Sequence, residues 1–222
     1  MPGPEGPFPW WLGAVGALFA VLAAALVIGS LDRPSPTAFV PDTAAVPAGP
    51  GGVRTVTLDA RSPDRWIRFD LDSGRAVTAD AGGWDLALRR FHVIVNGGAG
   101  LPGRAAAAPT GDTALASVRR PPPDGWRRTT ADGDGELRHP LLEDWYDYDF
   151  FSHLLRARPE VWAVRSASGE AWKLRFLSYY CPGPEAGCVT FRYARLPAGP
   201  GDAGDAPAGA VGAAAGPGRP AP

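Results

Sequence analysis

Three histidines, His92, His139 and His153, are the side chains of this sequence best suited to acid–base chemistry or metal ligation near neutral pH. An enzyme that paired one of them with a nucleophile would need a Ser or Cys held beside the imidazole. The sequence contains no GxSxG, HExxH or CxxCH motif, which are common local signatures of catalytic and haem-attachment sites. The histidines therefore lend no support to an enzyme, and we expect a protein without catalytic activity.

Three other motifs have structural explanations. Residues 142–151 interleave acidic and aromatic side chains, a pattern more typical of a strand with an exposed polar face than of an acid/base pair. Residues 98–103 fit GxGxxG, but Pro102 lies inside the motif and no helix clearly follows, so a dinucleotide fingerprint is not indicated. Residues 132–136 lack the ligand spacing of a calcium loop, and we expect a solvated turn there.

The two cysteines, Cys181 and Cys188, flank the sequence Pro-Gly-Pro-Glu-Ala-Gly, whose composition favours a reversal of the chain. A metal site or a redox pair are alternatives, but there is no CxxC motif and no nearby His. We therefore expect a structural disulfide that closes a hairpin. Such a bond implies an oxidising compartment outside the cytoplasmic membrane.

Short strand-like runs separated by turn residues must position these groups. Between residues 161 and 196 the pattern predicts a three-stranded antiparallel meander, and in 189–193 apolar and polar residues alternate as in a strand with one buried face. The residues between 97 and 160 show a looser pattern, rich in Gly, Ala and Pro, and we expect mostly irregular loops. The predicted strands cover residues 53–58, 66–71, 84–88, 91–95, 161–165, 171–180 and 189–196.

The two ends of the chain differ from this β domain in composition. Residues 10–31 are almost wholly apolar and long enough to span a bilayer, so residues 1–31 are predicted to be a membrane anchor or a signal segment, with the anchor favoured. Residues 32–52 and 197–222 consist mainly of Ala, Gly, Pro and small polar residues, and we expect a disordered linker and a disordered tail. One domain, 53–196, lies between them.

The charge of the chain bears on its partners. Lys and Arg number 22 against 23 Asp and Glu, so there is no basic surplus to neutralise a phosphate backbone. Nucleic-acid binding is therefore not expected. The single Arg near the apolar segment, Arg33, would place the domain in the cytoplasm by the positive-inside rule, whereas the cysteines favour export. We expect a single-pass membrane protein with its domain in the periplasm or outside the cell.

Several segments resemble the HmuY family of exported, membrane-tethered bacterial haem-binding proteins. The resemblance covers roughly residues 55–196. It is most specific in Trp84-Asp85, in Asn96-Gly97-Gly98 and in the run Lys-Leu-Arg-Phe-Leu-Ser-Tyr-Tyr at 173–180. It implies an all-β domain without enzymatic activity that captures haem or a related tetrapyrrole.

The resemblance also implies where axial ligands of haem would lie. Characterised relatives use two His or Met side chains from the irregular region before the C-terminal meander. Met1 is the sole Met in this chain, so His139 and His153 are the candidates, and His92 is expected to be a structural residue of a strand. No Cys stands directly after the apolar segment, so the chain departs from the lipoprotein form common in the family. The alternative function is a non-catalytic accessory subunit of a larger membrane protein complex that has lost ligand binding.

Overall fold

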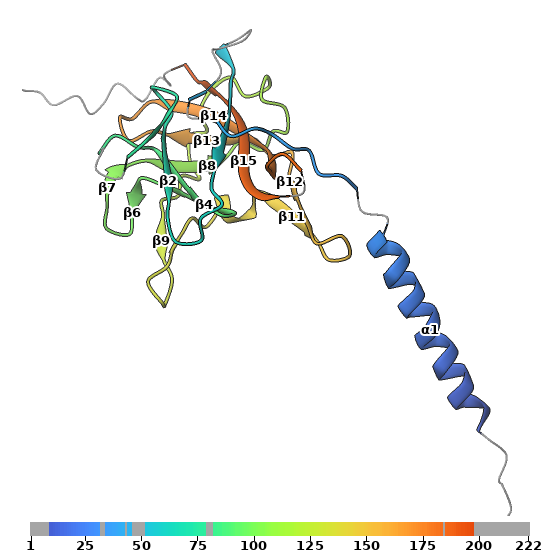
Figure 1. Ribbon diagram of the computed structural model, residues 1–222. Helices are drawn as coiled ribbons and strands as arrows, with labels where there is room; N and C mark the ends of the chain where they lie inside the picture. The colour runs from blue at the N-terminus through green and yellow to red at the C-terminus, as the bar shows by residue number, and fades with distance from the viewer. Residues whose placement is uncertain are drawn as a thin grey trace, which may run out of the picture.

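The computed structural model describes residues 9–31, 34–42, 44–45, 52–78, 82–183 and 185–197. Within this part of the chain, one long helix precedes a compact set of strands (Figure 1). The predicted tail lies outside the described residues from residue 198 onward, as do positions 32–33, 43 and 46–51 of the predicted linker.

The helix α1 spans Trp10–Leu31 and has no buried residue. It is long and apolar enough to cross a membrane, by length and composition, and it lies near the N-terminus, where a signal sequence would have the same properties. In Figure 1 it extends away from the β domain instead of packing on it. Exposure of so much apolar surface to water is unfavourable, and the described part of the β domain does not cover it.

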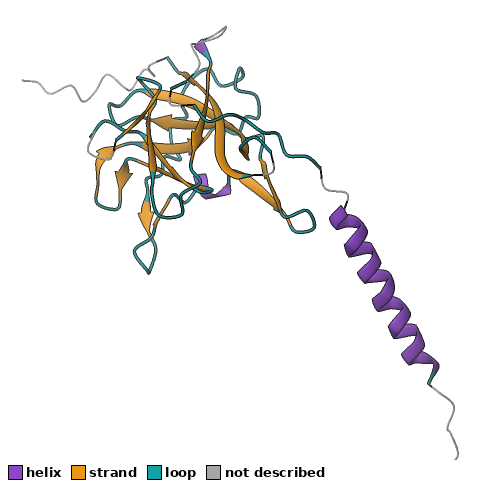
Figure 2. Ribbon diagram, viewed as in Figure 1, coloured by secondary structure: helices purple, strands orange, loops and turns teal. Residues whose placement is uncertain are grey.

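The remaining elements are short strands and one 3-10 turn, η2, at Leu142–Asp144. Two long strands, β14 and β15, dominate the C-terminal half (Figure 2). The strands are β1 Arg54–Asp59, β2 Ile67–Asp70, β3 Arg75–Val77, β4 Leu86–Arg89, β5 His92–Val95, β6 Gly97–Gly98, β7 Leu101–Arg104, β8 Ala106–Pro109, β9 Thr130–Ala131, β10 Leu137–Arg138, β11 Tyr146–Asp149, β12 Leu154–Ala157, β13 Trp162–Arg165, β14 Ala171–Tyr180 and β15 Ala186–Arg195.

The strands form two main sheets, and all pairs between named strands are antiparallel. The larger sheet has the order β1-β15-β14-β13-β8, and the smaller has the order β3-β2-β4-β5. The pairs β6–β7, β9–β10 and β11–β12 form separate ribbons. An all-β domain of antiparallel sheets preceded by an apolar helix is therefore confirmed.

The core lies between the two main sheets. Phe69 of β2 meets Phe191 and Tyr193 of β15 edge-on, with ring centroids 5.5 and 5.7 Å apart. Trp145 packs against Phe176 of β14 at 4.7 Å and donates its indole N–H to the carbonyl of Phe91. Large aromatic side chains thus pack between the sheets and help to hold them together.

The strand β15 differs from the expectation of one buried face. Thr190 lies on the predicted polar face but is fully buried, and its hydroxyl is 2.9 Å from that of Thr57 on the neighbouring strand β1. The polar face is covered at this position, and the two hydroxyls satisfy each other. Arg192, two residues further on, is exposed as predicted.

The region 97–160 holds more regular structure than its composition indicates. The strand β8 contains three alanines, all buried, and pairs with β13 at the edge of the larger sheet. Ala has a low strand propensity, but its small side chain allows close packing beneath this edge.

The predicted linker is also more ordered than expected, wherever it is described. The N–H of Phe39 donates to the carbonyl of Tyr180, and the N–H of Ala45 donates to the carbonyl of Gly74. Ala38 forms a parallel bridge with Tyr180. Residues 34–42 and 44–45 therefore lie along the domain, because their backbone groups complete hydrogen bonds that the edges of the sheets leave open.

Candidate functional site

A cavity of about 720 Å³ opens where the β11–β12 hairpin meets the end of β14. Its volume is in the range of small-molecule and cofactor pockets. The turn between β4 and β5, the start of β15 and residues 34–36 complete its walls. The lining residues are Pro34, Ser35, Pro36, Arg90, Phe91, Tyr146, Tyr148, Ser152, His153, Leu154, Leu155, Tyr179, Tyr180 and Ala186.

Aromatic rings make up much of the cavity wall. The ring of Phe91 lies 5.6 Å from that of Tyr146 and 6.3 Å from that of Tyr179, both in edge-to-face arrangements. The guanidinium of Arg90 lies 6.0 Å from the centre of the Tyr179 ring. The wall therefore combines flat apolar surface, which suits a planar ligand, with one cation at its edge.

Two tyrosines at the end of β14 differ in how their hydroxyls are used. Tyr180 accepts a hydrogen bond from the N–H of Leu155 at 2.7 Å, which ties β14 to the hairpin. Tyr179 is buried, its hydroxyl has no hydrogen-bond partner among the described residues, and burial raises the pKa of this phenol. A buried polar atom without a partner is costly unless a ligand or water completes it.

His153 lies at the mouth of the cavity, on the reversal between β11 and β12. Asp149 shapes this reversal by accepting hydrogen bonds from the N–H groups of Phe151 and Ser152. His153 itself has a left-handed backbone with φ of 56°, which is uncommon for a side chain of this size. Its Nδ1 lies 2.5 Å from the hydroxyl of Tyr148, so one ring nitrogen is engaged and the ring is oriented.

His139, the other histidine of the predicted ligand pair, lies in the protein interior. Its Nδ1 accepts hydrogen bonds from the N–H groups of Leu141 and Leu142, and its Nε2 donates to the carbonyl of Arg127 at 3.1 Å. Burial lowers the pKa of His139 to about 4, so the ring is neutral at pH 7. Neither nitrogen is available to a metal in this arrangement, and His139 is not among the residues that line the cavity of His153.

His92 has the structural role expected for it. Its Nδ1 lies 2.9 Å from the carboxylate of Glu143, and Arg138 donates to the same carboxylate at 3.2 Å. These contacts tie β5 to η2 and β10. His92 is likewise outside the cavity lining.

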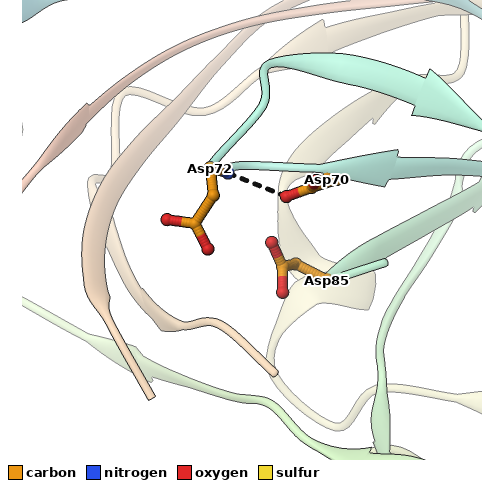
Figure 3. A group of neighbouring side chains, drawn as sticks. All are labelled: Asp70, Asp72 and Asp85. Carbon is orange, nitrogen blue, oxygen red and sulfur yellow. Dashed lines mark hydrogen bonds between the residues drawn. The ribbon is translucent and has the colours of Figure 1, made fainter. Parts of the chain in front are cut away.

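Three carboxylates form a second group with potential chemistry (Figure 3). Asp70 ends β2, Asp72 lies in the following turn, and Asp85 directly precedes β4; one oxygen of each lies within 4.8 Å of the others. Both oxygens of the buried Asp85 already accept backbone N–H groups, from Leu71 and Ala167. The group therefore supports the surrounding turns.

The disulfide predicted from the sequence is present. Cys181 and Cys188 are bonded to each other and join the end of β14 to the start of β15. Cys181 directly follows Tyr180, so the bond holds the part of the β14–β15 hairpin that borders the cavity. The described residues contain no free cysteine.

The tyrosines and the chain segment that complete the cavity are not predicted from the sequence pattern. Tyr179 and Tyr180 belong to a motif that carried the family resemblance. They also end a predicted strand just before a cysteine, and side chains at the end of a strand can border a site. Pro34, Ser35 and Pro36 gave no signal, because their composition is typical of a linker.

The family model of the HmuY protein matches residues 62–193, more than half of the chain. Comparison with curated proteins gives no match. The family is one of binding and transport proteins and is associated with haem.

Solved structures with the same fold are distant in sequence. The apo form of an HmuY analog from Tannerella forsythia is 17% identical with a TM-score of 0.56, and the match covers 66% of this chain and 96% of that protein. A Bacteroides vulgatus protein described as HmuY-like and haem-binding is 18% identical, with a TM-score of 0.55 and coverages of 69% and 97%. A Bacteroides fragilis protein described as a lipoprotein is 19% identical, with a TM-score of 0.54 and coverages of 69% and 96%. By the family match and this shared fold, the chain belongs to the HmuY family.

Proposed function

We propose that this chain binds haem or a related tetrapyrrole in the cavity between the β11–β12 hairpin and β14, and that α1 anchors it in a membrane. The observation that carries the proposal is the cavity itself, an aromatic pocket of about 720 Å³ with an imidazole at its mouth. Membership of a haem-associated family supports it, as does the haem-binding description of the Bacteroides vulgatus neighbour.

The donor groups of the cavity fit a tetrapyrrole with one imidazole ligand. Haem supplies an iron centre that accepts a neutral imidazole as an axial ligand. When Nδ1–H of His153 donates to the Tyr148 oxygen, its Nε2 presents a lone pair, and no described residue hydrogen-bonds to that nitrogen. Phe91 and Tyr146 would pack against the macrocycle, and Arg90 would pair with a carboxylate of the ligand.

This proposal keeps His153 from the predicted pair and gives His139 a structural role. Freeing Nδ1 of His139 would leave the N–H groups of Leu141 and Leu142 without an acceptor, at a cost of about 1 to 3 kcal/mol each, and freeing Nε2 would remove one of the two hydrogen bonds that the carbonyl of Arg127 accepts. Tyr179 also lines the cavity, and its buried hydroxyl has no hydrogen-bond partner among the described residues.

Titration of the full chain in detergent with haemin, followed by visible absorption, tests the binding. We expect a defined Soret band for the wild type and a weakened, shifted band for His153→Ala. Tyr148→Phe should give a smaller change, because it removes the group that orients the imidazole. His92→Ala is the matched control and should leave the spectrum unchanged.

Absence of haemin binding by the wild type would contradict the proposal and would favour the accessory-subunit function. Binding with an unchanged spectrum in His153→Ala would contradict the assignment of the ligand. Circular dichroism of each variant separates a lost ligand from a lost fold.

The location of the domain is a separate part of the proposal. We infer that α1 is retained as a single-pass anchor and that the domain from residue 53 lies in the periplasm or outside the cell, supported by the disulfide between Cys181 and Cys188. Reporter fusions after Leu196 test this. A reporter active in the cytoplasm alone would contradict it, and an N-terminus cleaved after α1 would identify a signal sequence.

A further inference from the structure

The large apolar side chains that the β domain exposes are gathered on one hairpin. Among the described residues from 52 onward, the large hydrophobic side chains that are exposed are Tyr148, Phe150 and Phe151, with exposed fractions of 54%, 69% and 61%. All three belong to β11 or to the reversal that joins it to β12. Such clustering is typical of a surface that contacts a partner, whereas single exposed apolar residues are common.

The end of this hairpin has the chemistry of an interfacial anchor. The reversal at 150–153 carries no acidic or basic residue except His153, and the rings of Phe150 and Phe151 lie 5.8 Å apart. The charged residues lie behind the reversal: Asp149, next to Phe150, is 3.7 Å from Arg156, and Arg158 pairs with Asp147 at 2.7 Å. Apolar rings in front of a polar, charged base match the gradient from acyl chains to headgroups at a bilayer surface.

The chain itself brings this hairpin to a membrane. The helix α1 ends at Leu31, and Pro34 already lines the same cavity as His153 and Leu154. Two residues lie between Leu31 and Pro34, so their Cα atoms are at most about 11 Å apart. The cavity mouth must therefore lie close to the point where α1 would leave the bilayer.

Residues 37–39, in the segment that connects α1 to the β domain, attach this tether to one end of β14. The hydroxyl of Ser178 donates to the carbonyl of Thr37, and the N–H of Phe39 donates to the carbonyl of Tyr180. These bonds hold the tether against the end of β14 that borders the hairpin. In Figure 1 the β11–β12 hairpin projects from the domain on the side where the chain leaves for α1.

We propose that Phe150 and Phe151 insert into the interface of the bilayer that α1 spans, so that the cavity opens at the membrane surface. The proposal rests on α1 being retained as an anchor, which is part of the proposed function, but it does not depend on the identity of the ligand. A ligand that partitions into lipid would then enter the cavity along the membrane.

Quenching of a label by lipid tests the insertion in the full chain. The native cysteines are joined to each other, so Phe150→Cys supplies a single free thiol for a fluorescent label. The chain is reconstituted into phosphatidylcholine vesicles, with and without a quencher attached to the acyl chains. Flotation of the vesicles is measured first and reports whether α1 anchors the protein.

The matched control carries the label at Ala116, which is exposed. Nearby Val118 packs against Ala171, at the opposite end of β14 from Tyr180, about 30 Å away along the strand. We expect several-fold stronger quenching at position 150 than at position 116. In the Phe150→Cys background, Phe151→Asp should reduce the quenching and Phe151→Leu should preserve it.

Equal quenching at the two positions in protein that floats with the vesicles would overturn the insertion and leave the anchor and the haem proposal standing. Protein that does not float would overturn the anchor and the insertion together, while haemin titration would still test the cavity. A third outcome is a label at position 150 that lipid does not quench but whose solvent exposure falls as the protein concentration rises. This outcome would assign the hairpin to a contact between copies of the chain and would also overturn the insertion.

Discussion

The carboxylate of Asp85 accepts a hydrogen bond from the backbone N–H of Ala167 at 2.7 Å, although 82 positions separate the two residues. Asp85 precedes β4 of the smaller sheet, and Ala167 lies in the turn between β13 and β14 of the larger sheet. The second oxygen of Asp85 accepts the N–H of Leu71 at 2.8 Å. One buried carboxylate thus joins the two sheets at the edge of the core.

This position makes the stability of the protein depend on the protonation of Asp85. Burial raises its pKa to about 6 from the ordinary value of 3.8, and the neighbouring carboxylates of Asp70 and Asp72 also raise it. The folded state therefore holds the proton more tightly than the unfolded state. Stability gained from Asp85 increases as the pH falls from about 6 to about 4, by an amount on the order of 3 kcal/mol.

We predict that Asp85→Asn removes this gain. The variant should lose stability more steeply than the wild type when urea unfolding is repeated between pH 7 and pH 4. Asp134→Asn, in the exposed turn between β9 and β10, is the matched control for loss of a carboxylate. A variant whose pH profile parallels that of the wild type would show that Asp85 does not titrate in this range.

Protonation of His139 has the opposite effect on the free energy of unfolding in the same pH range. Its folded pKa of about 4 lies below the ordinary value of 6.5, so the unfolded state takes up the proton first. Stability is therefore lost as the pH falls from about 6.5 to about 4. In His139→Asn this loss should disappear, while the stability at pH 7 should drop by about 1 to 3 kcal/mol because a buried ring is removed and the carbonyl of Arg127 keeps only its hydrogen bond from Ala107.

The opposing signs provide an internal check. Asp85→Asn should make the protein more sensitive to acid and His139→Asn should make it less sensitive, with the wild type between them. Greater acid sensitivity in both variants would refute the assignment to His139, and lower acid sensitivity in both would refute the assignment to Asp85.

The strand pattern of this domain could be predicted because its apolar residues repeat with the period of a half-buried strand. Tyr193 and Phe191 of β15 face the core together, as their spacing of two requires. The segments that carried the family resemblance also have a structural explanation. Asn96 donates its side-chain amide to the carbonyl of Trp84, so the Trp-Asp and Asn-Gly-Gly motifs meet in space.

The cavity could not be predicted in the same way, because its residues come from segments with different patterns. Pro34 belongs to a segment with the composition of a linker, and the sequence pattern predicts Phe91 in a strand, although β5 begins at His92. Nothing in the local sequence distinguishes the buried His139 from the exposed His153, since burial depends on which backbone groups the fold brings to each ring.

A third prediction concerns the two faces of β14. Trp172 lies in the main core, 5.6 Å from the ring of Tyr193, whereas Lys173 on the opposite face donates to the carbonyl of Val118. Trp172→Ala should cost about 3 to 5 kcal/mol in urea unfolding. Trp172→Phe should cost much less, because the indole N–H has no hydrogen-bond partner among the described residues. A larger loss for Lys173→Met than for Trp172→Ala would contradict this assignment of faces.

The disulfide should contribute to stability as well as report on the compartment. Closing the short loop between Cys181 and Cys188 should stabilise the fold by about 2 to 3 kcal/mol. The double variant Cys181→Ala, Cys188→Ala should show this loss, and reduction of the wild type should match it. Alkylation and mass analysis of protein taken from its native compartment should find both thiols blocked to the reagent until a reductant is added.

The last prediction separates two glycines that share a backbone conformation but differ in surroundings. Gly98 and Gly100 have φ values of +83° and +75°, which side chains other than glycine seldom adopt. A Cβ at Gly98 would lie 2.3 Å from the carbonyl oxygen of Thr129, whereas a Cβ at Gly100 would meet nothing within 4 Å. Gly100→Ala should therefore cost only the backbone strain of about 1 to 2 kcal/mol.

Gly98→Ala should cost clearly more in urea unfolding, because the backbone of Thr129 must also move. This movement would weaken the hydrogen bond from the N–H of Thr129 to the carbonyl of Gly97. Equal losses in the two variants would mean that the Asn-Gly-Gly segment is chosen for its turn conformation alone, and a greater loss in Gly98→Ala would show that close packing against residues 128–129 selects it.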